Sequence, residues 1–506
     1  MTARGPNRRD VCVGLGSAAL AGLSLRSRAA WAQDNPDNCA PPGVAGKNPV
    51  PYKPDPKLPV RVRKSAFELD KTEVDRLKEA YAALRKLTHD TPDDPRGWLR
   101  GGYVHCWYCG GGNDNQAGEE IHGSWLFFPW HRAYLHFHER ILCKLINDDT
   151  LAIPYWDWDS EGRQKFPSVY GDPSDPSNPL FDMLRSAKPS DSISNQAVSA
   201  AILNTTMNAP NNNLFLGSQA GDAGAMENAP HGPVHIWTGD TTMQNGNNDM
   251  GVLATAAQDP MFFAHHGNID RLWGVWLDLA PAQHKNFTSA TWTQHPWQFY
   301  DENAVWTEIK IEDVLDSVKS LRSEYAKPSA KPIWTFRPRS RPATAAAAAE
   351  SLVATASFSM TNATAAPITL GVAPVTREIA IPQQEIHAFA QLGPTSPAQY
   401  VLYIRGIEAP NDGQAMFNVF LNLPDATAAT STESPNFVGT VTVLAKTKSP
   451  IARAPVTTNA AFDVTDVLSK LTGIENLSVT LAPAAAGGIA PTASQATFRQ
   501  ISLERF

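Results

Sequence analysis

The positions of the histidines constrain the fold of this chain more than any other feature of its sequence. Seven of its 13 histidines fall into two clusters, which a long polar segment separates. One i, i+4 pair places two imidazole rings on the same face of a helix. If the clusters form one site, the fold brings distant segments together and offers three rings to each of two metals. The members are His105, His122 and His131 in the first cluster, and His231, His235, His265 and His266 in the second.

The chemistry of imidazole narrows the choice of metal. It is a neutral, borderline-soft ligand that suits copper, zinc, iron or nickel. Three nitrogen ligands per metal leave coordination positions open, as dioxygen chemistry requires. The competing interpretation is a zinc peptidase, in which a glutamate follows the first histidine of such a pair and serves as the base. Gly232 stands at that position here, so the pattern favours a redox-active metal pair.

Helical periodicity dominates the N-terminal part of the chain. Hydrophobic residues recur at helical spacing over residues 70–87 and 127–146, and again over residues 259–276. Between the second and third of these segments, residues 172–213 are rich in Pro, Ser, Asn and Asp, which is typical of a long surface loop. The pattern predicts a mainly helical domain with long loops over residues 33–340.

The composition changes near residue 340. An alanine run at residues 345–349 predicts a linker over 341–350, with a short helical spacer as the alternative. Tryptophan and cysteine are absent after it, and short alternating segments predict an antiparallel β-sandwich over residues 351–506, with one helical interruption at 464–471. Two domains agree with a chain of 506 residues. The predicted strands are residues 400–407, 416–423, 437–444, 477–481 and 498–503.

The N-terminus has the pattern of an export signal. Arg8 and Arg9 precede an apolar run over residues 11–25, and Ala30-Trp31-Ala32 supplies a cleavage site. The run is short for a membrane span. Paired arginines indicate the twin-arginine route, with an ordinary Sec signal as the alternative. The expected location is therefore periplasmic or secreted, with residues 1–32 removed and no membrane anchor left.

Net charge narrows the choice of partners. The formal net charge is −7, and the predicted signal is basic, so the remainder is more acidic than the whole. Such a body should repel nucleic acid and anionic membrane surfaces. A small organic substrate is the better match. The sequence leaves open the oligomeric state and whether a separate chaperone delivers a metal.

Several segments together resemble the common central domain of tyrosinases, catechol oxidases and plant-type polyphenol oxidases. The resemblance extends to the segment that follows the plant catalytic domain, here within residues 298–340, and to the plant C-terminal domain. Together with the signal, it identifies the chain as an exported bacterial member with a four-helix-bundle core that holds two coppers. The matching segments are residues 103–109, 122–132, 154–159, 227–240, 259–273, 300–303, 309–318, 416–422 and 437–443.

The resemblance implies a ligand set for each copper. In the family, the last ligand lies four residues before an aspartate, here Asp270, which selects His266 and leaves His265 as a neighbouring packing residue. His136 and His138 have no ligand counterpart and are interpreted as packing residues. The implied ligands are His105, His122 and His131 for one copper, and His231, His235 and His266 for the other.

The resemblance also separates the cysteines. Cys109 matches a residue that often forms a thioether with the histidine at position 122, and a free buried thiol is the alternative. Cys39 and Cys106 match a plant-type disulfide, and closing so long a loop would stabilise the fold by roughly 4 kcal/mol in the chain-entropy model. Cys143 is expected to be a small buried residue.

The implied activity is oxidation of catechols to o-quinones with reduction of O₂ to water, and weaker hydroxylation of monophenols. Glu227 matches a glutamate that orients a water near the coppers, with a capping role as the alternative. Gly232, Ile236 and Leu253 are expected to line the substrate pocket. Relatives with strong monophenol activity often carry asparagine where Gly232 stands, so diphenol oxidation should predominate.

Two other kinds of function use the same features differently. A hemocyanin-like protein would bind dioxygen at six histidines without turnover. A carbohydrate- or surface-binding protein would use the sandwich and leave the histidines idle. The C-terminal domain also has two interpretations: it covers the copper site until it is loosened, or it is a permanent structural domain.

Overall fold

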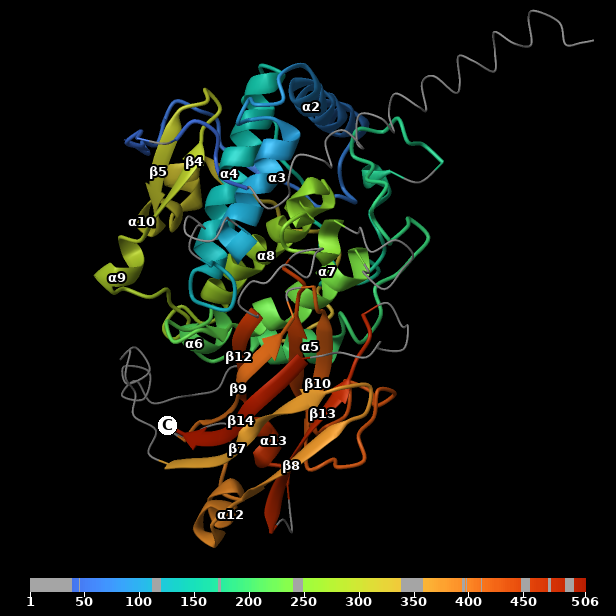
Figure 1. The fold of residues 1–506 in the computed structure, drawn as a ribbon, viewed down its shortest axis with the longest axis vertical. Coiled ribbons are helices and arrows are strands. Elements are labelled where there is room, and N and C mark those ends of the chain that lie inside the picture. Colours follow the sequence, from blue (N-terminus) through green and yellow to red (C-terminus); the bar gives the residue numbers. More distant parts are fainter. Residues whose placement is uncertain are drawn as a thin grey trace, which may run out of the picture.

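The computed structural model has a helical N-terminal part and a C-terminal part built of strands (Figure 1). The predicted fold class, a mainly helical domain followed by an antiparallel β-sandwich, is confirmed. The predicted signal peptide at 1–32 and linker at 341–350 lie outside the described residues. The structure describes residues 39–44, 46–111, 120–171, 174–239, 249–337, 358–393, 396, 398–410, 412–446, 456–471, 475–486 and 496–506.

Helix α4 (Phe127–Leu145) is the central element of the helical part. Every residue from 127 to 143 is buried, so this helix has no solvent-exposed face over that length. Helices α2 (Lys71–Asp90) and α8 (Met261–Leu279) pack against it, and α3 (Trp98–Cys106) contacts α2. The three helices expected from periodicity are confirmed, with small differences at their ends. No helix in the described part of the chain is both long and apolar enough to cross a bilayer.

The prediction that residues 172–213 form loop throughout is wrong at its C-terminal end. Helices α5 (Ala200–Met207) and α6 (Asn212–Phe215) lie there. The side chains of Ser199 and Asn211 accept hydrogen bonds from backbone N–H groups in the first turns, so the polar residues that suggested a loop are helix caps. The other helices are α7 (Gly232–Thr238), α9 (Ala290–Thr293), α10 (Ile311–Val314), α12 (Gln383–Phe389) and α13 (Thr465–Leu468), with π-helical turns η1 (Trp107–Gly111), η3 (Glu227–His231) and η6 (Ser317–Leu321).

The C-terminal part consists of two facing sheets. One has the strand order β11-β10-β13-β8, and the other has the order β12-β9-β14-β7 with β3 (Asp222–Ala223) of the helical part added beside β12. The five predicted strands are confirmed, whereas β7, β8 and β12 were missed. The strands are β7 (Phe358–Leu370), β8 (Val375–Ala380), β9 (Tyr400–Ala409), β10 (Ala415–Leu421), β11 (Phe437–Val443), β12 (Val456–Asp463), β13 (Asn476–Pro483) and β14 (Ala496–Arg505).

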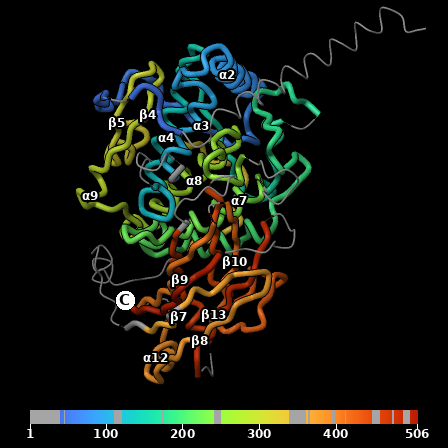
Figure 2. The backbone as a smooth tube through the Cα atoms, viewed as in Figure 1, coloured from blue at the N-terminus to red at the C-terminus, as the bar shows by residue number. Residues whose placement is uncertain are grey.

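The helical part contributes backbone to the sandwich. Strand β3 (Asp222–Ala223) pairs in parallel with β12, through Asn459 and Ala460. A second contact is the parallel bridge between Val252 and Ala445. The upper ends of the sandwich strands lie below the helices of the N-terminal part in Figures 1 and 2, which share one viewpoint, and β11 contacts η3 and α7. Main-chain hydrogen bonds therefore join the two parts next to the second histidine cluster.

Short strands tie the N-terminal arm to the segment that follows α8. Strand β1 (Val50–Pro51) pairs in parallel with β5 (Trp306–Lys310), which also pairs with β4 (Pro296–Tyr300). Strand β2 (Arg61–Arg63) pairs with β6 (Ser323–Tyr325). The predicted disulfide between Cys39 and Cys106 is present, with a Cα–Cα distance of 5.7 Å. It joins the start of this arm to the end of α3.

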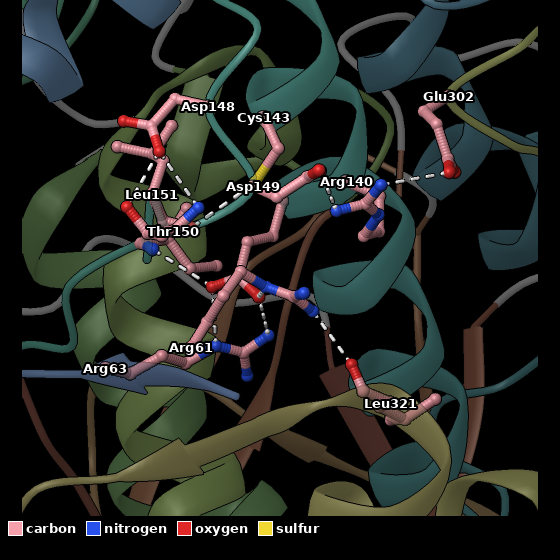
Figure 3. A network of polar contacts seen from close by, with 12 residues as sticks. Arg61, Arg63, Arg140, Cys143, Asp148, Asp149, Thr150, Leu151, Glu302 and Leu321 are labelled. Atoms are coloured by element: carbon pink, nitrogen blue, oxygen red, sulfur yellow. Dashed lines mark hydrogen bonds and ion pairs between the residues drawn. The ribbon is translucent and has the colours of Figure 1, made fainter. Parts of the chain in front are cut away.

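A buried ion network lies between β2 and α4 (Figure 3). Glu139 of α4 is fully buried and accepts hydrogen bonds from Arg61 Nε at 2.7 Å and Arg63 Nε at 2.9 Å. Burial opposes ionisation of Glu139, but Arg63 and Arg61 outweigh it and lower its pKa to about 2. Both carboxylate oxygens are therefore charged and paired at neutral pH.

The same network continues to the helix that carries the last histidines. Arg63 donates to the Tyr325 hydroxyl, which donates to Asp270 at 2.6 Å. The other carboxylate oxygen of Asp270 accepts from Arg132 Nε, also at 2.6 Å. Arg132 follows His131 on α4, and Asp270 lies one turn after His266 on α8. This ion pair therefore fixes two histidine-bearing helices relative to each other.

Replacing Glu139 with Gln should lower the stability of the protein strongly, because Arg61 and Arg63 would stay buried with one negative charge removed. Breaking a buried pair costs roughly 3–5 kcal/mol. Urea unfolding followed by circular dichroism would measure this as a lower midpoint. The control is Asp75→Asn, which removes an exposed i, i+4 partner of Lys71 and should cost less than about 1 kcal/mol. Equal effects of the two changes would contradict this role for the network.

Candidate metal centre

The six histidines predicted as ligands meet between the helices of the N-terminal part. Five of these residues are at most 2% exposed, and the side chain of His122 is 11% exposed. Most sit on regular elements whose packing sets their positions. The carriers are α3 (His105), the segment before α4 (His122), α4 (His131), the end of η3 (His231), α7 (His235) and α8 (His266).

The rings form two groups of three. In the first, the centroid distances are 5.3 Å from His105 to His122, 5.4 Å from His122 to His131 and 5.6 Å from His105 to His131. This is the spacing expected of rings that surround one ion. The first predicted ligand set is therefore assembled in space, although its members come from three separate segments.

The second group is equally compact. His231 lies 4.6 Å from His235 and 5.0 Å from His266, and His235 lies 5.4 Å from His266, between ring centroids. The two groups touch, because the rings of His131 and His266 stack at 4.1 Å. Two metals held by these groups would be neighbours.

Backbone carbonyl groups hold the rings in a defined orientation. In four of the histidines, Nδ1 lies within hydrogen-bond distance of a carbonyl oxygen. A carbonyl only accepts, so Nδ1 carries the proton and Nε2 keeps its lone pair. The pairs are His105 with Leu253 (2.7 Å), His131 with Phe127 (2.7 Å), His231 with Glu227 (3.2 Å) and His235 with Met250 (2.8 Å).

Three of the inward-facing nitrogens have no partner in the protein, whereas Nε2 of His235 lies 3.2 Å from Nε2 of His266. Nε2 is buried and unbonded in His122, His131 and His231. Buried polar atoms are nearly always bonded, so each such atom calls for a ligand. Burial also lowers the pKa of His235 to about 3, and lowers those of His131 and His231 well below the usual value. Neutral imidazoles with free, inward-facing lone pairs fit a pair of copper ions.

His265 is a seventh ring at the site. Ligand atoms of His231, His235, His265 and His266 all lie within 4.8 Å of one another. Trp158 Nε1 donates to Nδ1 of His265 at 3.2 Å and leaves its Nε2 unbonded. Because an indole N–H only donates, Nδ1 of His265 is the acceptor, and the neutral ring then carries its proton on Nε2 with no lone pair there for a metal. This supports His266 as the last ligand, and the choice stays a prediction.

Cys109 lies beside the first group. It is buried and carries a free thiol, and a ligand atom of each of His105 and His122 lies within 4.8 Å of its Sγ. Sγ is 3.4 Å from both ring nitrogens of His105. The sulfur therefore touches His105 and lies within 4.8 Å of a ring nitrogen of His122, the predicted partner of the thioether, and that bond stays a prediction.

Glu227 combines burial with an unpartnered oxygen. Its Oε1 accepts from the backbone N–H of Gly123 at 2.6 Å, and its Oε2 is buried without a partner. Burial raises the pKa of Glu227 to about 8, and the hydrogen bond from Gly123 only partly opposes this. The carboxyl group is thus placed to hold or pass a proton near neutral pH.

A cavity of about 60 Å³ connects Glu227 to both histidine groups. The helical part contributes one wall and the sandwich contributes the other. Predicted pocket residues Gly232 and Leu253 line it. Ile236 does not and is buried in the main core instead, because it follows His235 on α7 and so leaves the helix about 100° away. The lining includes Glu120, His122, Glu227, His231, Gly232 and Leu253 on one side, and Thr442, Val443, Leu444, Lys446, Thr457 and Thr458 on the other.

The two further histidines of α4 have packing roles, as predicted. His138 stacks on Phe263 at 3.4 Å between centroids and lies 3.0 Å from the Tyr81 hydroxyl. His136 makes an edge contact with Tyr52. Both are buried.

Comparison with known proteins accounts for this arrangement. The common central domain of tyrosinase matches residues 95–184 and 182–279, the polyphenol oxidase middle domain matches 286–339, and the chloroplastic polyphenol oxidase C-terminal domain matches 367–496. The latent form of chloroplastic polyphenol oxidase from Prunus armeniaca is 32% identical to this chain over 94% of its length, and over 84% of the relative. The chain belongs to the tyrosinase and polyphenol oxidase family.

Solved structures of this family share the whole fold. A latent aurone synthase has a TM-score of 0.71 at 27% identity, covering 92% of this chain and 93% of its own. Latent apple tyrosinase has a TM-score of 0.68 at 29% identity, covering 90% and 100% respectively. The similarity includes the sandwich as well as the helical part.

The sequence did not predict which residues of the sandwich face the metal centre. A Cβ atom at Gly232 would meet Thr442 Cγ2 at 2.5 Å, so Thr442 occupies the space that the glycine leaves. Lys446 forms an ion pair with Glu120 at 2.6 Å. The one hint of this contact in the sequence was the position of Glu120, two residues before His122. Thr442 lay in a predicted strand with nothing to indicate what it touches.

The raised pKa of Glu227 predicts how the stability of the copper-free protein depends on pH. Below about 4.5 the group is protonated in both states. From there to about 8 only the unfolded state loses its proton, so the fold loses stability as pH rises, by on the order of a few kcal/mol. Glu227→Gln keeps the acceptor for Gly123 and should flatten this decline. Thermal unfolding of both proteins between pH 5 and pH 8 would measure it, and parallel curves would contradict it.

Proposed function

We propose that this chain is a dicopper polyphenol oxidase that converts o-diphenols to o-quinones. Two catechols lose four electrons and four protons, and one O₂ takes them up to give two waters. The observation that carries the proposal is the pair of adjacent groups of enclosed imidazoles, in which Nε2 of His122, His131 and His231 is buried without a partner. The relative from Prunus armeniaca is a polyphenol oxidase, which supports the same reaction.

The residues that would hold the coppers are the six predicted ones. His105, His122 and His131 would bind one ion, and His231, His235 and His266 the other. When bound, the copper pair supplies redox exchange between the phenol and O₂. The carbonyl groups behind the rings keep His105, His131, His231 and His235 in one tautomer. Buried aromatic neighbours such as Phe127 and Phe262 exclude water from the rings.

Two side chains would act on the substrate side. Glu227 has a free oxygen in the cavity and a pKa close to neutrality, so it would take the phenolic proton directly or through a water. A thioether between Cys109 and His122 would restrict that ring and lower its reorganisation during turnover. Gly232 offers no side chain to hold a water beside His231, so we rank diphenol oxidation above monophenol hydroxylation.

The sandwich would act as a lid. The cavity of about 60 Å³ is much smaller than the roughly 150 Å³ that accommodates benzene in a protein core. Thr442 and Lys446 form its outer wall, and the relatives with solved structures include latent forms. A catechol would enter only after this wall has moved away.

Export would precede activity. The paired arginines and apolar run at the N-terminus support a bacterial, twin-arginine route to the periplasm or beyond. The relatives matched here are plant chloroplastic enzymes, so the bacterial assignment rests on this segment alone. Burial of the rings makes delivery by a copper chaperone reasonable.

Copper-loaded protein should take up oxygen with catechol and much more slowly with tyrosine. Glu227→Gln should lower kcat by about 10²–10⁴-fold, the usual contribution of a general base, while copper content stays at two per chain. Oxygen uptake and metal analysis on the same samples would measure both. Oxygen binding without catechol turnover would instead indicate a carrier, and loss of copper from the variant would indicate a structural role for Glu227.

Opening the lid should raise activity. Cleavage within residues 338–357 in mild detergent should increase catechol oxidation per copper at least about tenfold, a change equivalent to about 1.4 kcal/mol. Thr442→Gly should increase the activity of the uncut chain in the same direction. Unchanged rates after both treatments would identify the sandwich as a permanent structural domain.

A further inference from the structure

One ion pair crosses the cavity between the sandwich and the metal centre. Lys446 Nζ lies 2.6 Å from Glu120 Oε2, with side chains 19% and 33% exposed. Two main-chain hydrogen bonds position Lys446: Leu253 N–H donates to the carbonyl of Ala445, and Ala254 N–H donates to that of Lys446. The lysine is therefore directed into the cavity by the docking of the two parts.

Glu120 is held in place from the other side. Its Oε1 accepts from the backbone N–H of His122 at 3.1 Å and lies 3.3 Å from Nδ1 of that ring. This leaves Oε2 turned towards Lys446. Among the described residues, Lys446 is the only lysine or arginine that pairs with Glu120.

The lid thus fills the cavity with two groups of different character. Thr442 places a small uncharged group against Gly232, next to His231. Lys446 places a primary ammonium against Glu120. Both lie in the space where a phenol has to approach the ligands, and Glu227 adds a buried, unpartnered oxygen to the same space.

We propose that the preferred substrates are catechols that carry a primary amine, and that Lys446 occupies the place of the substrate ammonium. This inference rests on the proposed function. When the lid opens, Glu120 loses its cation while it remains partly buried, and leaving such a charge unpaired is unfavourable. A substrate ammonium restores the pair. A catechol with a carboxylate brings a like charge to Glu120 and is disfavoured.

The test compares three catechols that differ in their terminal group: 4-(2-aminoethyl)catechol, 4-ethylcatechol and 3,4-dihydroxyphenylacetate. The copper-loaded full chain is used after cleavage within residues 338–357 in mild detergent. We expect kcat/KM to be about tenfold higher for the amine than for the neutral catechol and lowest for the acid, with the difference in KM rather than kcat. A tenfold ratio corresponds to about 1.4 kcal/mol, close to the lower end of the net contribution of a hydrogen bond to a charged group.

Glu120→Gln should bring the amine-to-neutral ratio close to one and raise the acid-to-neutral ratio. Glu120→Lys should favour the acid. Each ratio compares two substrates on the same preparation of one variant. A smaller folded or copper-loaded fraction lowers both rates equally and drops out of the ratio. Glu73→Gln is the matched control, because Glu73 pairs with Lys64 at 2.6 Å and is 27% exposed but does not line the cavity. Its capping contact in α2 tolerates glutamine.

The two proposals fail in different ways. If the wild type does not oxidise 4-ethylcatechol, the proposed function is wrong. If it oxidises all three catechols with equal kcat/KM, or if Glu120→Gln leaves the ratios unchanged, the amine preference is overturned and the oxidase activity stands.

Discussion

The centre depends on hydrogen bonds between imidazole Nδ1 atoms and backbone carbonyls. They are made by rings from α3, α4, the end of η3 and α7, and each carbonyl belongs to the helix itself or to a segment packed on it. A side-chain acceptor could rotate, whereas a main-chain carbonyl moves only with its element. The direction of each free lone pair is therefore set by helix packing, and burial keeps the rings neutral.

Helix packing in turn depends on buried charge. The ion pair between Arg132 and Asp270 joins α4 to α8. Arg132 lies one residue after His131, and Asp270 lies one turn after His266. Glu139 extends the network to the N-terminal arm. Hydrophobic contacts alone would permit small sliding of the two helices. Directional ion pairs remove that freedom, which matters where rings from both helices stack at 4.1 Å.

Much of this arrangement could be predicted from the sequence. Helical periodicity located α2, α4 and α8. The spacing of the histidines located both groups of rings. The disulfide partners followed from the resemblance to the family. Other features escaped because they depend on context. β12 and β7 lack a strong alternating pattern, the caps of α5 and α6 look like loop residues, and Ile236 shares a helix with a ligand without sharing its face. The roles of Thr442 and Lys446 exist only because two domains dock.

The pairing of β3 with β12 has a consequence for maturation. A peptide cut between the domains would not separate them, since two backbone segments of the helical part remain hydrogen-bonded to the sandwich. The nicked molecule would migrate as two fragments under denaturing conditions and as one particle under native ones. Because main-chain contacts do not depend on side-chain identity, the surface of the sandwich is free to diverge while its docking geometry persists.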